Sequence, residues 1–175
     1  MANNLAERRL IVRVHQVWLK AAGTSYPRRA QIDPTELGRD WANCAMIDLD
    51  AILTRSRFSY VGSALRDLSS PTFERQCIGE CLEGSLLELA TRQVPQVVEE
   101  NQALSFAGSA IHQDVNILYR AILLPLSENG TQIDGMLAAI GCREIAVDQG
   151  FRIGEADPGR RAIITGGMER PRSPN

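Results

Sequence analysis

The sequence is poor in aromatic residues, has few cysteines and lacks an excess of either charge. Phe, Trp and Tyr make up 5% of its 175 residues, and 19 Lys and Arg nearly balance 21 Asp and Glu. A net charge of −2 and a pI near 5.7 provide no basic surface for neutralising phosphates, which argues against nucleic-acid binding. Four cysteines in a chain with no export signal are expected to be reduced thiols rather than a disulfide framework.

Signals for secretion or membrane insertion are also missing. The N-terminal stretch MANNLAERRLIVRVHQVW carries charges inside its apolar pattern. It therefore matches neither the apolar core of a signal peptide nor an uncharged membrane span. We expect a cytoplasmic protein without membrane partners.

The sequence contains none of the common catalytic motifs. There is no GxSxG, HExxH, P-loop or GxGxxG pattern. Asp48 and Asp50 are two residues apart and would share a strand face, as paired carboxylates do, but solvated strand charges explain them as well. We predict no enzymatic activity, and a small hydrolase or isomerase is disfavoured because no acid, base and nucleophile set is present.

The most prominent feature of the sequence is a pair of long apolar runs between Asn116 and Glu144. They are separated by Ser127-Glu128-Asn129-Gly130, and Asn-Gly between apolar runs predicts a tight hairpin reversal. Side chains alternate along a strand, so both faces of the first arm are apolar. One face carries Ile117, Tyr119, Ala121 and Leu123, and the other carries Leu118, Ile122 and Leu124. Both faces therefore need cover from helices or a second subunit.

Residues 1–24 are predicted to form an amphipathic helix that ends near Gly23. Its apolar stripe is Leu5, Leu10, Val14, Val17, Trp18 and Ala21, and its solvated side carries Arg8, Arg9, Arg13 and Lys20. The stripe is too large to leave in water, so the helix should lie on the sheet or against a partner helix.

The remaining elements are predicted in chain order. A short helix starts at Asp33-Pro34 and runs toward Trp41. Residues 45–53 form a half-buried strand that pairs with residues 57–61, and residues 64–68 form one or two helical turns. A loop and a short helix follow over residues 69–84. Residues 84–101 have helical spacing interrupted by Pro95, which either starts a new turn or kinks the helix, and residues 103–111 form the third of five antiparallel strands.

This element order resembles that of a PAS domain, and the residues look like a bacterial branch of single-domain PAS proteins. The matching pieces spread from Val17 to Ile140. They are Trp18, the segment Pro27 to Pro34 with Leu37, the segment Tyr60 to Leu65, Tyr119-Arg120, and Leu123 to Ser127 with Gly130 and Ile133-Asp134. The chain departs from the branch over Ser69 to Leu82, which borders the ligand cavity in PAS domains.

The resemblance implies an α+β fold, with a five-stranded antiparallel sheet and helices in the middle of the chain. It places the sensory domain at residues 25–150, after the N-terminal helix, and we expect residues 151–175 to be a mobile C-terminal tail. It also implies a sensory, signal-transducing module that binds a small molecule or a protein, and a homodimer formed through the N-terminal helix. A signalling partner protein would receive the output.

Ligand contacts, if a ligand binds, are predicted at Trp41, Tyr60, Tyr119 and Leu123. No cofactor is predicted, although an unidentified small molecule remains compatible with the sequence. The alternative function is a structural adaptor with a filled core and no ligand.

The cysteines and histidines have functional and structural interpretations. Cys77 and Cys81 are four apart and could join Cys44 or His112 in a metal site, but the spacing favours small buried thiols. His112 lies in a polar reversal between strands, where a solvated turn residue is the simpler role. His15 lies beside the apolar stripe of the N-terminal helix, where packing is favoured over haem ligation.

Overall fold

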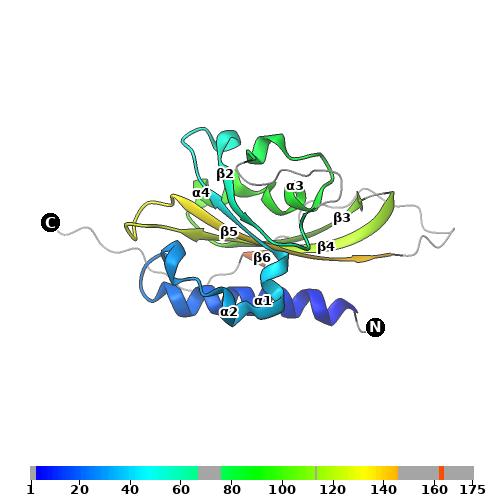
Figure 1. Ribbon diagram of the computed structural model, residues 1–175, viewed down its shortest axis with the longest axis horizontal. Coiled ribbons are helices and arrows are strands. Elements are labelled where there is room, and N and C mark those ends of the chain that lie inside the picture. Colours follow the sequence, from blue (N-terminus) through cyan, green and yellow to red (C-terminus); the bar gives the residue numbers. More distant parts are fainter. Residues whose placement is uncertain (1–2, 67–75, 113, 146–161, 164–175) are drawn as a thin grey trace.

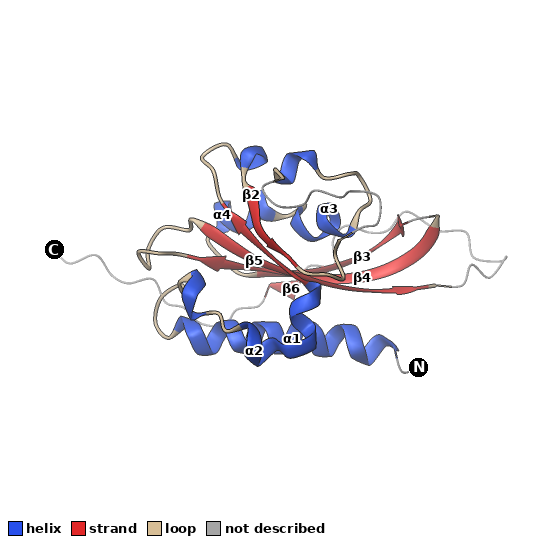
Figure 2. Ribbon diagram, in the orientation of Figure 1, coloured by secondary structure: helices blue, strands red, loops and turns tan. Residues whose placement is uncertain are grey.

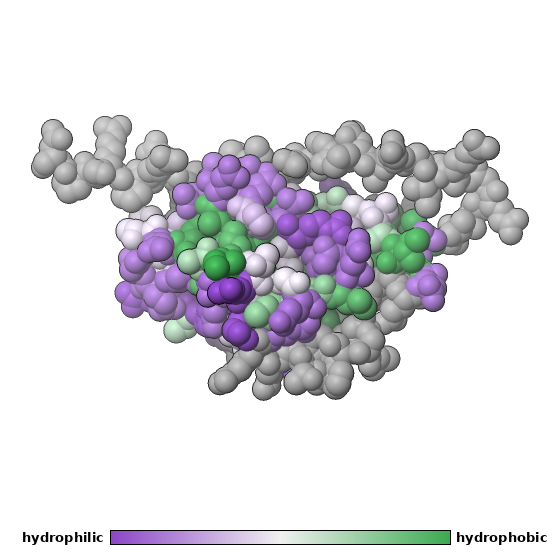
Figure 3. All heavy atoms as spheres, turned by 90° about the horizontal axis from the view of Figure 1, so that it is seen from above, coloured by the Kyte–Doolittle hydropathy of each residue, from purple (hydrophilic) through white to green (hydrophobic). Residues whose placement is uncertain are grey.

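The computed structural model describes residues 3–66, 76–112, 114–145 and 162–163. Its strands form one antiparallel sheet in the order β2-β1-β5-β4-β3-β6. Figure 1 shows α1 on one side of this sheet and the short helices α3 and α4 on the other. The three layers are coloured by element type in Figure 2, and Figure 3 shows the molecule from above with its hydrophilic and hydrophobic surface. The predicted cover of both sheet faces is therefore confirmed, by the leading helix on one face and mid-chain helices on the other.

The elements follow one another as a leading helix, two strands, the mid-chain helices and then the remaining strands. Their bounds are α1 (Asn3–Ala22), η1 (Arg29–Gln31), α2 (Pro34–Leu37), η2 (Gly38–Asn43), β1 (Cys44–Asp48), η3 (Leu53–Arg55), β2 (Arg57–Val61), η4 (Ile78–Glu80), α3 (Leu86–Thr91), α4 (Val94–Glu100), β3 (Leu104–His112), β4 (Val115–Leu126), β5 (Gly135–Glu144) and β6 (Ala162–Ile163). The η elements are 3-10 helices.

The hairpin predicted at residues 116–144 is confirmed as β4 and β5, which pair from Ile117↔Glu144 to Leu126↔Gly135. The reversal is longer than the predicted tight turn, because residues 127–134 separate the last paired residues. The Asn129 side chain organises this loop by accepting hydrogen bonds from the backbone N–H groups of Thr131 and Gln132 at 3.0 and 2.9 Å. An Asn side chain that folds back on its own loop in this way replaces the two-residue turn that the Asn-Gly pair predicted.

The leading helix α1 lies on β4 and β5 and ends before Gly23, which has φ +56°. Its buried stripe is Leu10, Ile11, Val14, Trp18 and Ala22. The Trp18 indole N–H donates to the carbonyl oxygen of Pro125 at 2.8 Å inside this contact. On the polar side, Arg13 pairs with Asp40 and Lys20 with Glu36, so α1 is also tied to the segment of α2 and η2.

The first strand differs from its prediction at its end and in its burial. β1 stops at Asp48, because the Asp50 carboxylate accepts the Ile52 N–H at 2.8 Å and turns the chain into η3. Asp48 and Asp50 therefore do not share a strand face. The predicted half-buried pattern is also wrong, since Cys44 to Ile47 are all buried and the strand packs on both sides.

A β-bulge lies in β2 opposite β1. Met46 pairs with Tyr60 and Ile47 with Phe58, so Ser59 has no partner in β1. One extra residue in a strand changes which side chains share a face. Phe58 and Val61 consequently point to the α3 side of the sheet, while Tyr60 points to the α1 side.

Pro95 interrupts the helical spacing of residues 84–101 because two separate helices, α3 and α4, form there. Pro95 lies in the first turn of α4, where a missing N–H costs no intrahelical bond, so it starts a new helix after α3. The predicted helix at Asp33-Pro34 is confirmed as α2, with the Asp33 carboxylate accepting the Thr35 N–H at 2.8 Å, and it continues as the 3-10 helix η2. The segment after Gly62 is a hydrogen-bonded turn rather than a helix up to Arg66.

Some predictions fall outside the described residues. These are the segment 67–75 and most of the tail predicted over 151–175. Within that tail, Ala162–Ile163 form β6, which pairs with Leu104 and Ser105 of β3 and adds a sixth, very short strand to the predicted five.

Candidate functional site

The two faces of the sheet bury separate apolar clusters. We call the set on the helix α3 side the α3 cluster and the set under α1 the α1 cluster. The α3 cluster contains Ala45, Ile47, Phe58, Val61, Leu65, Leu87, Leu89, Ala90, Val94, Val97, Leu104, Ile117, Tyr119, Ala121, Leu123, Met136, Ala138 and Ile140. The α1 cluster contains Leu10, Ile11, Val14, Trp18, Ala22, Ile32, Leu37, Cys44, Met46, Ile122, Leu124, Leu126, Leu137 and Ala139.

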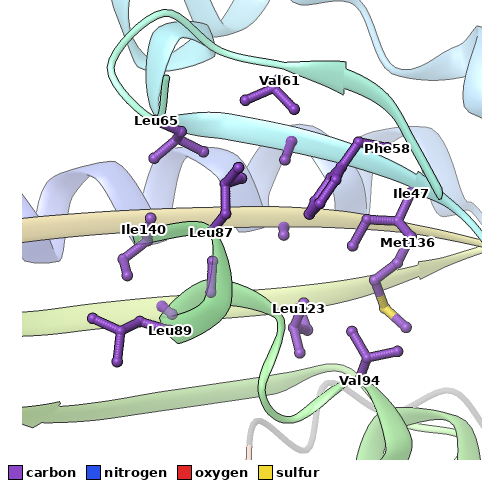
Figure 4. Close-up of a cluster of buried hydrophobic side chains, with 14 of the residues drawn as sticks. Ile47, Phe58, Val61, Leu65, Leu87, Leu89, Val94, Leu123, Met136 and Ile140 are labelled. Atoms are coloured by element: carbon purple, nitrogen blue, oxygen red, sulfur yellow. The ribbon is translucent and has the colours of Figure 1, made fainter. Parts of the chain in front are cut away.

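The α3 cluster is the candidate ligand-binding side. Figure 4 shows side chains from α3 and α4, such as Leu87 and Val94, facing side chains from the strands, such as Leu123 and Met136. The strand positions at the middle of this face are small, because Ala45 pairs with Ala138 across β1 and β5. Small residues on the sheet leave the larger side chains of the helices to fill the layer.

Tyr119 is the only residue of the α3 cluster with a side-chain hydroxyl group. It is 6% exposed, and its ring meets Phe106 edge-on with centroids 6.5 Å apart. Burial raises the pKa of the Tyr119 phenol, and the Glu88 charge raises it further, while Arg92 lowers it. A phenol hydroxyl both donates and accepts hydrogen bonds, so the Tyr119 hydroxyl can bond to a polar atom of a ligand or to water.

The ion pair between Glu88 of α3 and the following Arg92 influences the pKa of the Tyr119 phenol. Arg92 Nε and Nη2 each donate to a carboxylate oxygen of Glu88 at 2.8 Å, and the Gly84 N–H donates to Glu88 at 3.2 Å. These hydrogen bonds, with that from Arg92 the largest effect, hold the pKa of Glu88 below its usual value. The pair therefore stays charged at neutral pH beside an otherwise apolar cluster.

The four predicted ligand residues do not come together. Tyr119 and Leu123 belong to the α3 cluster and lie four residues apart on the same face of β4, with Ala121 between them. Trp41 and Tyr60 pack against the α1 cluster on the opposite face, where their rings stack at 4.4 Å and the Tyr60 hydroxyl donates to the Trp41 carbonyl at 3.1 Å. Since the sheet separates the two pairs, one small molecule cannot contact all four.

Cys44, Cys81 and His15 pack against other side chains rather than forming a metal or haem site among the described residues. Burial raises the pKa of the Cys44 thiol to about 12 and that of the Cys81 thiol to about 12. Cys44 lies in the α1 cluster, whereas Cys81 packs against the α3 cluster across the sheet. Within the part of the chain that the structure describes, no three His, Cys, Asp or Glu side chains gather as metal ligands would. His15 stacks on Trp18, with centroids 6.1 Å apart, and burial lowers its pKa.

Sequence reasoning missed three residues around Tyr119. Gly108 lies opposite Tyr119 in the β3–β4 pair, and Glu88 and Arg92 approach from α3. A glycine inside a strand pattern is a signal for close approach of another group. Glu88 and Arg92 are four residues apart, which is the spacing of a helical ion pair.

The topology agrees with the resemblance drawn from the sequence. Five strands in the order 2-1-5-4-3, with helices between the second and third strands, form an antiparallel sheet covered by an N-terminal helix. The chain has a PAS-like fold. No protein-family model matches this chain, and no curated protein sequence matches it either.

A solved structure similar to this PAS-like domain is described as the light state of the blue-light photoreceptor Aureochrome1 LOV. The sequences are 15% identical, and the match covers 62% of this chain and 84% of that chain with a TM-score of 0.39. Among the described residues, no helix is both long enough and apolar enough to cross a membrane.

Proposed function

We propose that this PAS-like domain is a non-enzymatic sensory module that binds a small, mainly apolar molecule within the α3 cluster. The observation that carries the proposal is Tyr119, which is 6% exposed and supplies the one side-chain hydroxyl group of the otherwise apolar α3 cluster. Ligand sites of this type combine apolar walls with one or two polar groups that orient the ligand. Leu123, four residues further along the same face of β4, would contact the other end of the molecule.

The α3 side is the better candidate because its cover is built from short pieces. α3 has 6 residues and α4 has 7, lengths at which a helix has little stability of its own. By contrast, α1 has 20 residues, a buried hydrogen bond to β4 and two ion pairs to the following segment. A ligand that enters by displacing α3 or α4 would disturb fewer interactions than one that enters beneath α1. The response would be a shift between two arrangements of these helices on the sheet.

Native mass spectrometry of the purified chain, followed by denaturation and small-molecule analysis, tests this proposal. We expect a stoichiometric bound molecule, and we expect Tyr119→Phe to reduce its occupancy because the ring stays while the hydroxyl is lost. Tyr60→Phe, on the other face, is the matched control and should leave occupancy unchanged. Repeated absence of any bound molecule in the parent chain would contradict the proposal.

The second candidate function is a structural adaptor with a filled core. It is favoured by the close burial of the α3 cluster, in which Leu89, Ala121 and Leu123 are 0% exposed. The adaptor would bind partner proteins through its surface and would hold no ligand in its core. A chain that repeatedly purifies without a small molecule but binds a protein partner would favour this function.

We also propose a homodimer formed through α1, acting in the cytoplasm. The apolar stripe of α1 is used inside the subunit, so the contact would involve the outward face. Val12 and Leu19 lie seven residues apart on that face and are 52% and 42% exposed. A seven-residue spacing places both on one line along a helix, as in a coiled-coil seam. Signal would leave through a partner protein bound by this dimer.

A further inference from the structure

One edge of the sheet is only partly covered. β6 pairs with β3 at Leu104 and Ser105 alone. From Phe106 to Ala110, no strand among the described residues pairs with the outer edge of β3, although β4 pairs with the inner edge along its whole length. At the far end, Gly84 lies close to the carbonyl oxygen of Ile111. An edge strand presents a row of backbone N–H and C=O groups that another strand can use.

The side chains along this edge do not prevent another strand from pairing with it. Residues 106–111 read Phe-Ala-Gly-Ser-Ala-Ile, without a charge or a proline. Natural edge strands usually carry lysines, prolines or bulges that prevent pairing with another chain. The α1-side positions of β3 are small and partly or fully exposed at Ser105, Ala107 and Ser109, and α1 packs on β4 and β5 instead. A strand added here would meet neither a charge nor a bulky side chain on that side.

The chain itself shows which kind of segment the edge accepts. β6 is antiparallel to β3 and consists of Ala162 and Ile163, one small and one β-branched residue. Only two residue pairs connect β6 to β3, and an isolated strand pair of this length is not stable on its own. It is held because it belongs to the same chain, which gives it an effective concentration on the order of millimolar. A competing strand that pairs along more of β3 can replace it.

We propose that the outer edge of β3, from Leu104 to Ala110, is a docking site for an extended segment of another protein, and that β6 occupies it as a displaceable segment of the chain itself. The partner segment is rich in small and β-branched residues, of the type Ala162-Ile163-Ile164, and lacks proline. Its backbone hydrogen bonds supply affinity, as in other cases of strand addition. This inference goes beyond the proposed function, because it needs no ligand in the α3 cluster.

The register of β6 makes the proposal specific. Ile163 is opposite Leu104 and Ala162 is opposite Ser105. A peptide of residues 159–166, GRRAIITG, that binds in the same register places its Arg160 opposite Ala107 of the protein. Because charges directly opposite one another on paired strands interact, the charge at position 107 should control binding of this peptide.

The test measures binding of the fluorescein-labelled peptide GRRAIITG to the full chain by fluorescence anisotropy. Ile163→Pro removes a backbone N–H from β6 and should free the edge, so we expect peptide affinity to rise at least about tenfold over the parent chain. In the Ile163→Pro background, Ala107→Glu should strengthen binding and Ala107→Lys should weaken it, each by about twofold to fivefold at low salt.

Ile52→Glu and Ile52→Lys are the matched controls, because Ile52 is 50% exposed away from this edge and should not influence the peptide. Circular dichroism and thermal melting of every variant confirm that the fold is kept. Equal peptide affinity of the parent and the Ile163→Pro chain would overturn the proposal, as would equal affinity of the two Ala107 variants. An Ile163→Pro chain that forms a larger assembly than the parent chain without peptide would also overturn it, by showing that a second copy takes the edge.

Discussion

The Tyr119 ring lies against the backbone of Gly108, its direct partner across β3 and β4. A Cβ atom built on Gly108 would lie 2.8 Å from the Tyr119 hydroxyl oxygen and 3.0 Å from two ring carbons. These distances are shorter than real Cβ contacts, so the missing side chain of Gly108 makes room for the ring. A glycine in an edge strand covered by an aromatic ring from the neighbouring strand is a known stabilising pair in sheets.

Gly108→Ala should destabilise the fold by about 1–2 kcal/mol, because the new methyl group forces the Tyr119 ring out of its place. Without that contact, alanine would be the better strand residue. Urea unfolding measures the change. Ala107→Gly, one position away and exposed, is the control, and coupling between Gly108→Ala and Tyr119→Leu would identify the ring as the cause. Equal stability of Gly108→Ala and the parent chain would contradict the contact.

Trp18→Phe should cost about 1–3 kcal/mol, because it leaves the buried Pro125 carbonyl without its indole donor. Leu19→Ala on the outward face of α1 should change stability by no more than about 0.5 kcal/mol. Thermal unfolding of the two variants checks the comparison. A Trp18→Phe chain as stable as Leu19→Ala would show that the hydrogen bond contributes nothing.

Glu88→Gln should reduce stability at pH 7 by about 0.5 kcal/mol, the size of an exposed helical ion pair. The pKa of Glu88 is lowered in the folded chain, chiefly by hydrogen bonds from Arg92, so the pair stabilises the fold above the unfolded pKa of glutamate. This contribution is lost as pH falls through the lowered pKa. The difference from the parent chain should therefore shrink below about pH 4, near the ordinary glutamate value. Glu99→Gln, exposed on α4, serves as control, and a difference that persists in acid would contradict the assignment.

Cys142 should react fastest with a thiol reagent at pH 8, because it is the exposed cysteine. Burial raises the pKa of Cys44 and of Cys81 to about 12, so little thiolate forms at either site. Mass spectrometry after brief labelling should show one modified thiol in the parent chain and none in Cys142→Ser. Rapid labelling of Cys142→Ser would mean that a buried thiol is accessible.

Val12→Glu with Leu19→Glu should convert the proposed dimer to a monomer, since both exposed side chains lie on the outward line of α1. Light scattering after gel filtration measures the mass. Ile52→Glu controls for added charge. Deletion of residues 1–22 is a poorer test, because it would uncover the α1 cluster, including Leu124 and Leu137. A parent chain that is monomeric at all concentrations would remove the dimer proposal.

The alternation of apolar residues in the hairpin was enough to assign its faces. Tyr119 and Leu123 lie in the α3 cluster and Ile122 and Leu124 in the α1 cluster, as a period of two requires. The position of Tyr60 could not be read in this way. The bulge at Ser59 changes the face of every later residue in β2, and a bulge depends on the pairing with β1 rather than on the local pattern.

The loop after β4 shows the same limit at shorter range. Asn129-Gly130 correctly indicated a reversal, but the Asn129 side chain bonds Thr131 and Gln132 and widens it. The strand predicted to reach Leu53 ends at Asp48 because of the Asp50 turn, which competes with continued pairing.

By itself, the sequence determined the element order, the leading helix and the apolar hairpin covered on both faces, because periodicity and turn residues act over a few neighbouring positions. Tertiary structure alone decided that Trp41 and Tyr60 lie across the sheet from Tyr119, that Gly108 admits the Tyr119 ring, and that Ala162–Ile163 reach the edge of β3. Each of these depends on the register between segments far apart in the chain. Register is set by how all the strands pack together, and no local pattern carries it.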